Sequence, residues 1–171
     1  MRIIYISRFW TIIVDSLAWA IIQPGIAYLS MRFPPSLLEP DAWLFRTRAW
    51  EKGGEIYDRV LRVRRWKGRL PSGGTLFPGG FPMYHIASRD EDYLQTWVSE
   101  TCRAELCHWL AILPSVLFFF WNPPWLGAIM VAYAILFNAV PIVVQRHNRP
   151  RLQAIIRRRE RQKTPTSLHP R

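Results

Sequence analysis

Four side chains suited to acid–base chemistry lie within nine residues of this sequence: Glu100, Arg103, Glu105 and His108. A histidine exchanges protons near neutral pH, and a carboxylate beside it can hold the ring and stabilise its charged form. At about 100° per residue, His108 falls between Glu105 and Glu100 on one face of a helix. The cluster indicates either an acid–base site or the solvated start of a helix whose charges only set its depth, and the residues alone leave both open.

The elements that must position this cluster follow from the apolar stretch after it. Residues 106–145 contain no Asp, Glu, Lys or Arg, and about 20 apolar residues suffice for a membrane-spanning helix. The stretch is interrupted by Trp121-Asn122-Pro123-Pro124-Trp125, a tight turn with interfacial tryptophans. The sequence therefore predicts a helix over 90–121, begun by acidic residues and continuing into the membrane, and a return span over 125–145.

A second set of polar side chains lies along the return span and its continuation. Asn138 is followed at spacings of 7, 10 and 11 residues by Gln145, Asn148 and Arg149. These spacings place the set on a single stripe of a helix. Two antiparallel spans joined by a short turn bring their other ends together, so the stripe meets Glu100–His108 at one depth. This convergence of two polar clusters predicts an active site.

Composition places the chain among integral membrane proteins. Half of its 171 residues are hydrophobic, yet its net charge is +11. The two properties are segregated: a first apolar span covers 9–29, whereas positive charge is concentrated in 32–103, which includes the segment 36–88 between the first two spans, and in a tail over 146–171. Basic segments beside spans suit anionic lipids, and no nucleic-acid-binding motif accompanies them. We expect a single all-α membrane domain, residues 1–171, with about three transmembrane helices and no nucleic-acid partner.

Between the first two spans, the sequence predicts amphipathic interfacial helices followed by an irregular loop. Arginines alternate with tryptophan and phenylalanine over about 36–52, and the pattern recurs over about 55–66. Such helices lie in the headgroup layer of a bilayer. Gly53-Gly54 separates the two, and residues 66–82 are too rich in glycine and proline for a regular helix or central strand.

The first span contains two unusual features. Asp15 lies inside it, where an acidic side chain faces protein or water, so a functional role and simple hydration both stay open. Pro24-Gly25 is expected to kink or end the helix.

The distribution of charge predicts the orientation in a plasma membrane. The middle region and the tail are strongly basic, whereas the turn at 121–125 is uncharged. Because basic segments stay on the cytoplasmic side, we expect a multi-pass protein with a cytoplasmic middle region and C-terminus. Arg8 opposes this orientation mildly.

Five motifs together resemble those of the glycosyl-4,4'-diaponeurosporenoate acyltransferases. They are Arg48-x-Trp50-Glu51-x-Gly53-Gly54-x-x-Tyr57, Val63-Arg-Arg-Trp66-Lys67-x-x-Leu70-Pro71, Glu100-Thr-Cys-Arg103-Ala-Glu105-x-x-His108-Trp109, Asn122-Pro123, and Asn138-x-x-Pro141-x-x-x-Gln145-Arg146-x-Asn148-Arg149-Pro-Arg151. The likeness covers about residues 40–152. Members of that family are small membrane proteins that place a fatty acyl group on the sugar of a glycosylated carotenoid acid, the last step toward staphyloxanthin-type pigments. The resemblance implies O-acyl transfer to a glycosyl hydroxyl.

That reaction assigns roles to the polar residues. Acyl transfer to a hydroxyl needs a base, for which His108 is the candidate, with Glu105 or Glu100 orienting its ring. The Asn138 amide is expected to stabilise the oxyanion or to hold the sugar. A further set is expected to bind substrate, its cations taking the phosphates of a carrier such as coenzyme A. This set is Arg103, Lys67, Gln145, Arg146, Asn148 and Arg149.

The expected partners are a bilayer with anionic lipids, a hydrophobic glycosylated acceptor and a fatty acyl donor. The donor, acyl-CoA or an acyl carrier protein, would act as a co-substrate. We expect no tightly bound cofactor and no metal.

Two other classes of function stay open. Glu105-x-x-His108 has the spacing of half a carboxylate-bridged di-metal site, as in a membrane oxidase. The chain's other histidines do not supply a second half-site: His85, His147 and His169. The cluster could instead hold helices together in a non-enzymatic anchoring or assembly module. Interhelical hydrogen bonds in bilayers contribute only about 1 kcal/mol each, so a cluster this dense exceeds what helix association requires.

Overall fold

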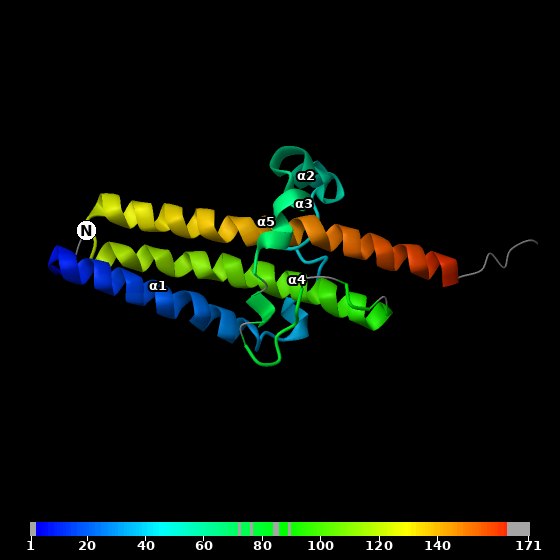
Figure 1. The fold of residues 1–171 in the computed structure, drawn as a ribbon, viewed down its shortest axis with the longest axis horizontal. Coiled ribbons are helices and arrows are strands. Elements are labelled where there is room, and N and C mark those ends of the chain that lie inside the picture. Colours follow the sequence, from blue (N-terminus) through cyan, green and yellow to red (C-terminus); the bar gives the residue numbers. More distant parts are fainter. Residues whose placement is uncertain (1–2, 72, 76, 84–85, 89, 164–171) are drawn as a thin grey trace, which may run out of the picture.

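The computed structural model describes residues 3–71, 73–75, 77–83, 86–88 and 90–163, and every regular element within them is a helix. Three long helices dominate it (Figure 1): α1 (Arg8–Ser30), α4 (Glu91–Ile112) and α5 (Pro124–Lys163). α4 continues directly into the 3-10 helix η5 (Leu113–Phe120). Helix α1, the α4–η5 unit and helix α5 are each long and apolar enough to cross a membrane. The predicted all-α architecture with three candidate spans is confirmed.

The three long helices lie side by side with α4 in the middle, and neighbouring helices run in opposite directions (Figure 1). The backbone N–H groups of Ile3 and Ile4 both donate to the carbonyl oxygen of Phe120, at 2.8 and 2.9 Å. Ile3 and Ile4 therefore lie at the end of the bundle that also holds the turn between η5 and α5. The segment between α1 and α4 and the basic half of α5 lie toward the other end.

Prolines interrupt these helices less than the sequence suggested. α1 continues through Pro24, so the helix does not end there. Pro114 lies where α4 gives way to the 3-10 helix η5, so the helix type changes at this proline. α5 contains Pro141 and Pro150 and still runs for 40 residues, which makes the predicted tail continuous with the span as far as Lys163. Packed membrane helices tolerate proline because neighbouring groups satisfy the freed carbonyls. The rest of the tail, His169 included, and the loop residue His85 lie outside the described residues.

The expected interfacial helix over 36–52 is wrong. The segment contains only 3-10 helices among irregular turns, namely η1 (Pro35–Leu37) and the start of η2 (Ala49–Gly54). Its Leu38 and Phe45 side chains pack on protein, and the described segment forms no amphipathic α-helix.

Two arginines of α5 explain why this segment is irregular. Arg146 Nη1 donates to the Leu44 carbonyl oxygen at 3.0 Å, and Arg149 Nη1 donates to that of Phe45 at 2.7 Å. These carbonyls consequently bond outside their own segment. The Phe45 side chain is buried, with its ring centroid 5.2 Å from the Arg149 guanidinium, and Leu38 is buried in the same cluster.

The helix predicted over about 55–66 is present as two short helices. They are α2 (Glu55–Leu61) and α3 (Val63–Trp66). Arg62 separates them because its φ of 52° lies in the left-handed region. At Gly54, where φ is 84°, a Cβ would lie 3.0 Å from the carbonyl oxygen of His147, so only glycine lets the chain rest on the α5 backbone there.

Residues 51–67, which we call the collar, pass around α5 from one side to the other (Figure 1). Their polar side chains contact three consecutive residues of α5. Glu51 binds Arg146, Asp58 binds His147, and Lys67 binds Asn148. Consecutive residues of a helix point about 100° apart, so the collar contacts α5 over more than half of its circumference.

After the collar, the described loop contains the short 3-10 helices η3 (Lys67–Arg69) and η4 (Gly73–Thr75). Phe81 in this loop packs against Tyr93 and Trp97 of α4. A buried cluster beneath it joins the first half of α4 to the last half of α5: Leu94, Trp97, Val98, Leu152 and Ile156.

Asp15 links α1 by hydrogen bonds to the turn between η5 and α5. Its buried Oδ1 accepts hydrogen bonds from Trp121 Nε1 at 2.7 Å and from Asn122 Nδ2 at 2.8 Å. The acidic residue that the sequence left open between function and hydration is therefore a partner of the turn between η5 and α5.

Replacing Asp15 with leucine is expected to lower the free energy of unfolding by about 1–3 kcal/mol, because two donors lose their acceptor at a buried site. Asp15→Asn retains an oxygen acceptor and should lose less. Thermal unfolding of the detergent-solubilised protein measures both. A leucine variant as stable as the wild type would contradict this assignment.

Candidate active site

His108 and Asn138 meet at the interface between α4 and α5. His108 Nδ1 lies 2.8 Å from Asn138 Oδ1, and the Asn138 side chain is fully buried. The structure thus brings together the predicted base on one helix and the predicted amide on the other. The two residues are 30 positions apart in the chain.

The hydrogen bonds of Asn138 fix which nitrogen of His108 carries the proton. Asn138 Nδ2 donates to the carbonyl oxygen of Ala134, one turn earlier, at 2.9 Å. This bond turns Oδ1 toward the imidazole. Because an amide oxygen only accepts hydrogen bonds, His108 Nδ1 is the donor, and Nε2 of the neutral ring is left as an acceptor. A histidine in this tautomer can remove a proton through Nε2.

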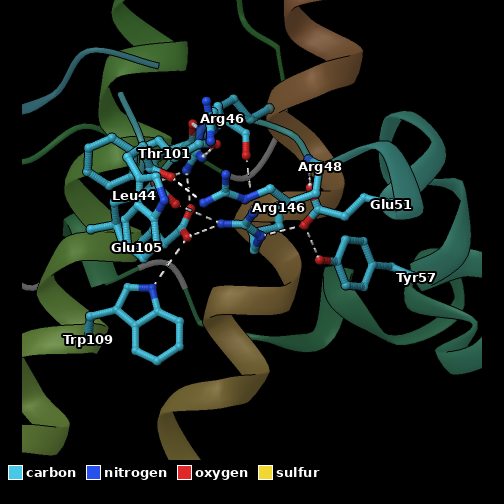
Figure 2. A network of polar contacts seen from close by, with 12 residues as sticks. Leu44, Arg46, Arg48, Glu51, Tyr57, Thr101, Glu105, Trp109 and Arg146 are labelled. Atoms are coloured by element: carbon cyan, nitrogen blue, oxygen red, sulfur yellow. Dashed lines mark hydrogen bonds and ion pairs between the residues drawn. The ribbon is translucent and has the colours of Figure 1, made fainter. Parts of the chain in front are cut away.

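Glu105 lies one turn before His108 but binds arginines. Its side chain is fully buried, with Oε2 at 2.5 Å from Arg149 Nη2. Its Oε1 lies 2.7 Å from Arg146 Nη1 (Figure 2). Trp109 Nε1 donates to Oε1 at 3.4 Å. Among the described residues, neither Glu105 nor Glu100 makes a hydrogen bond to His108, and the side chain that orients the ring is the Asn138 amide.

Arg146 links Glu105 to a second buried carboxylate, Glu51 of the collar. Its Nε donates to Glu51 Oε1 at 2.6 Å, Tyr57 Oη donates to the same oxygen at 2.5 Å, and the Arg48 backbone N–H donates to Oε2 at 2.6 Å (Figure 2). Burial alone would raise the pKa of the Glu51 carboxyl, but the hydrogen bonds from Arg146 and Tyr57 outweigh it and lower that pKa. Glu51 is therefore a charged partner for Arg146.

Arg149 is held more tightly still. Its guanidinium is fully buried and donates to Thr101 Oγ1 at 2.9 Å and to the Thr101 carbonyl oxygen at 3.1 Å, besides Glu105. Buried Arg149 and partly buried Arg146 thus face two buried carboxylates, because Arg146 bridges Glu51 and Glu105. Buried ions remain charged when opposite charges and hydrogen bonds match them in this way. The network forms a rigid frame beside His108, and its arginines already have anionic partners.

Glu100 and Arg103 pair with each other. Arg103 Nε lies 3.0 Å from Glu100 Oε1. Arg103 Nη1 also donates to the carbonyl oxygen of Ser30 at 2.7 Å and to that of Phe33 at 3.2 Å. These contacts attach the C-terminal end of α1 to α4, on a different side of α4 from the Glu105 network.

A separate polar cluster joins the collar to α5. Lys67 Nζ donates to Asn148 Oδ1 at 2.6 Å. His147, whose side chain is buried, has Nε2 at 3.0 Å from Asp58 Oδ2, and Arg151 Nη2 lies 2.9 Å from the same oxygen. Lys67 and Asn148, each predicted to bind substrate, are therefore in direct contact with one another, away from the arginine network.

Gln145 is the remaining predicted residue. It lies seven positions after Asn138, on the α5 face that packs against α4, and it is buried. Within the described part of the chain its amide has no hydrogen-bond partner, which distinguishes it from Asn138 and Asn148.

Sequence reasoning assigned no role to several residues that the structure places in these networks. They are Glu51, Tyr57, Asp58 and His147. The available signal was charge: Glu51 and Asp58 are acidic residues in an otherwise arginine-rich segment, and such residues commonly pair with buried cations.

Comparison with known proteins agrees with the motifs. A family described as glycosyl-4,4'-diaponeurosporenoate acyltransferase matches residues 41–158. Proteins of that name from Staphylococcus aureus strains USA300 and MRSA252 are each 34% identical to this chain over 142 residues, covering 83% of this chain and 86% of their own. No solved structure matches the chain.

These matches define the class of the protein as an acyltransferase, here built on three helices long and apolar enough to cross a membrane. Within that class, the chain belongs to the glycosyl-4,4'-diaponeurosporenoate acyltransferase family.

Proposed function

We propose that this protein transfers a fatty acyl group from a thioester donor to a sugar hydroxyl of a glycosylated carotenoid acid, with His108 as the general base. The relatives' name supplies the acceptor class. The observation that carries the choice of base is the hydrogen bond between His108 Nδ1 and Asn138 Oδ1, which leaves Nε2 as a proton acceptor between two helices.

In the proposed reaction, His108 Nε2 removes the proton of the sugar hydroxyl. The hydroxyl oxygen attacks the carbonyl carbon of the thioester at the same time. The new C–O bond forms, the C–S bond breaks, and the departing thiolate takes the proton from the imidazolium. The products are the sugar ester and the free thiol. Asn138 accepts the hydrogen bond of Nδ1–H in every step and stabilises the imidazolium, the part that a carboxylate plays in a hydrolase triad.

Gln145 is the proposed polar contact for the substrates. Its side chain is largely buried, its amide makes no hydrogen bond to the described residues, and it lies two turns from Asn138 on the same face. An amide without a partner supplies donors for a carbonyl or sugar oxygen. The apolar surfaces of the long helices suit the acyl chain and the carotenoid, and no tightly bound cofactor is required.

The proposed site faces the cytoplasmic boundary of a plasma membrane. The basic half of α5 and the arginine-rich middle region lie away from the uncharged turn between η5 and α5. Basic segments stay on the cytoplasmic side and are attracted to anionic lipids. A donor made in the cytoplasm and an acceptor dissolved in the bilayer would then both reach His108.

The test is product formation. Purified protein in lipid nanodiscs, supplied with a glycosylated carotenoid acid and a long-chain acyl-CoA, is expected to form an ester one acyl group heavier than the acceptor, detected by mass spectrometry. The same acceptor with its sugar hydroxyls methylated is the matched control and should give none. Acylation of the methylated control, or hydrolysis of the donor as the sole reaction, would overturn the proposal.

A further inference from the structure

Lys67 stands out among the cations of the site because no carboxylate binds it directly. In the described part of the chain, its Nζ donates to the neutral amide of Asn148, and no acidic side chain lies within ion-pair distance. The predicted phosphate ligands Arg103, Arg146 and Arg149 all have acidic partners. An ammonium group has three donors, so two remain available on Lys67.

Positive side chains outnumber carboxylates in the contacts around Lys67. Arg64 and Arg151 both bind the single carboxylate Asp58, at 2.8 and 2.9 Å. That carboxylate is also the acidic side chain whose charge acts on Lys67, so three cations depend on it. Burial of the partly covered Lys67 side chain, together with the nearby charge of Arg151, lowers its pKa, and a bound anion would offset both causes.

Lys67 also lies at a defined distance from the proposed base. Its partner Asn148 follows Asn138 by ten residues, which corresponds to about 15 Å along α5. Around the helix, Gln145 and Asn148 are displaced from Asn138 in the same sense, by about 20° and about 80°. An anion at Lys67 and a reacting carbonyl at His108 would thus be joined by an extended linker that passes Gln145.

We propose that Lys67, with Arg64 and Arg151 beside it, binds the phosphate of the acyl donor's phosphopantetheine arm, whose thioester then reaches His108. This arm is common to coenzyme A and to acyl carrier proteins. It joins a phosphate to a terminal sulfur through an extended chain with two amide groups, which suit the unpartnered Gln145 amide. The inference rests on the proposed acyl transfer. It adds a binding site for the phosphate end of the donor, for which the proposed reaction names no partner.

The experiment compares donors with and without the phosphate. Equilibrium binding of palmitoyl-CoA and of S-palmitoyl-pantetheine is measured on the full chain in nanodiscs, for the wild type, Lys67→Met and Lys67→Arg. We expect Lys67→Met to weaken palmitoyl-CoA binding about tenfold, the loss of one charge-assisted contact, and to leave palmitoyl-pantetheine binding unchanged. Lys67→Arg should retain most of the affinity. Arg59→Met, an exposed position of the same collar, is the matched control and should bind both donors normally.

The outcomes separate this inference from the proposed function. Equal weakening of both donors, or of neither, in Lys67→Met overturns the phosphate site. KM values for palmitoyl-CoA and for a palmitoyl carrier protein distinguish the sources of the arm, and a rise in either KM without a change in the acceptor KM supports the site. Because binding is measured without turnover, a failure of His108 as the base leaves the result at Lys67 intact.

Discussion

Replacing His108 with alanine is expected to reduce acyl transfer about 10²- to 10⁴-fold, the range that a positioned general base contributes. The loss should appear in kcat, because the imidazole acts on the hydroxyl proton and is not needed to hold the donor's phosphate. Initial rates of ester formation in nanodiscs measure it, after protein levels and membrane insertion have been matched to the wild type. Cys107→Ala, at the neighbouring position on α4, is the control and should keep full activity.

The hydrogen bond between His108 and Asn138 allows a second test of the proposed base. Asn138→Leu removes the acceptor that holds Nδ1–H and should lower kcat, whereas Asn138→Asp keeps an oxygen at that position and should retain more activity. Full transfer by both His108→Ala and Asn138→Leu would show that the reaction uses another base. If only Asn138→Leu fails to fold, the activity of His108→Ala decides whether His108 is the base.

The second large effect is expected at Glu105. Glu105→Gln removes the negative charge that faces Arg149 and Arg146 in a fully buried site. Removing one partner of a buried ion pair costs about 3–5 kcal/mol because the other charge is left unmatched. We expect a large fall in the thermal unfolding temperature and in the amount of protein that survives detergent extraction.

Two further variants make that prediction specific. Glu100→Gln disrupts the partly exposed pair with Arg103 and should cost under about 1 kcal/mol. The double variant Glu105→Met with Arg149→Met removes both charges together and should recover much of the stability, since well-packed apolar residues often replace a buried ion pair at little cost. If Glu105→Gln unfolds at the wild-type temperature, the network is not a structural frame.

The parts of the fold that follow from apolar patterning were predictable from the sequence. A forty-residue uncharged stretch divided by an Asn-Pro-Pro turn leaves few alternatives to two antiparallel helices. The same reasoning brings His108 to Asn138, because polar residues on facing stripes of such a pair must meet. The resemblance in motifs is sufficient to identify the family, since the family match spans the same part of the chain.

The collar and the segment before it could not be predicted by the same means. Alternating arginines and aromatic residues describe an interfacial helix and a packed irregular segment equally well, and the difference depends on hydrogen bonds from Arg146 and Arg149, about 100 residues away in sequence. Helical spacing alone predicts that the Glu105 carboxylate orients the His108 ring. Spacing ranks the neighbours on one helix but does not reveal that a facing helix supplies two guanidinium groups to the same carboxylate.

The contacts of the collar around much of α5 have a consequence for biosynthesis. Glu51, Asp58 and Lys67 are translated 95, 89 and 81 residues ahead of the positions they contact. These contacts between the collar and α5 cannot form until α5 has left the ribosome. Joining such distant segments costs entropy that increases only slowly with their separation. The contacts between the collar and α5 therefore form only after residues 146–148 have been synthesised, long after their partners in the collar.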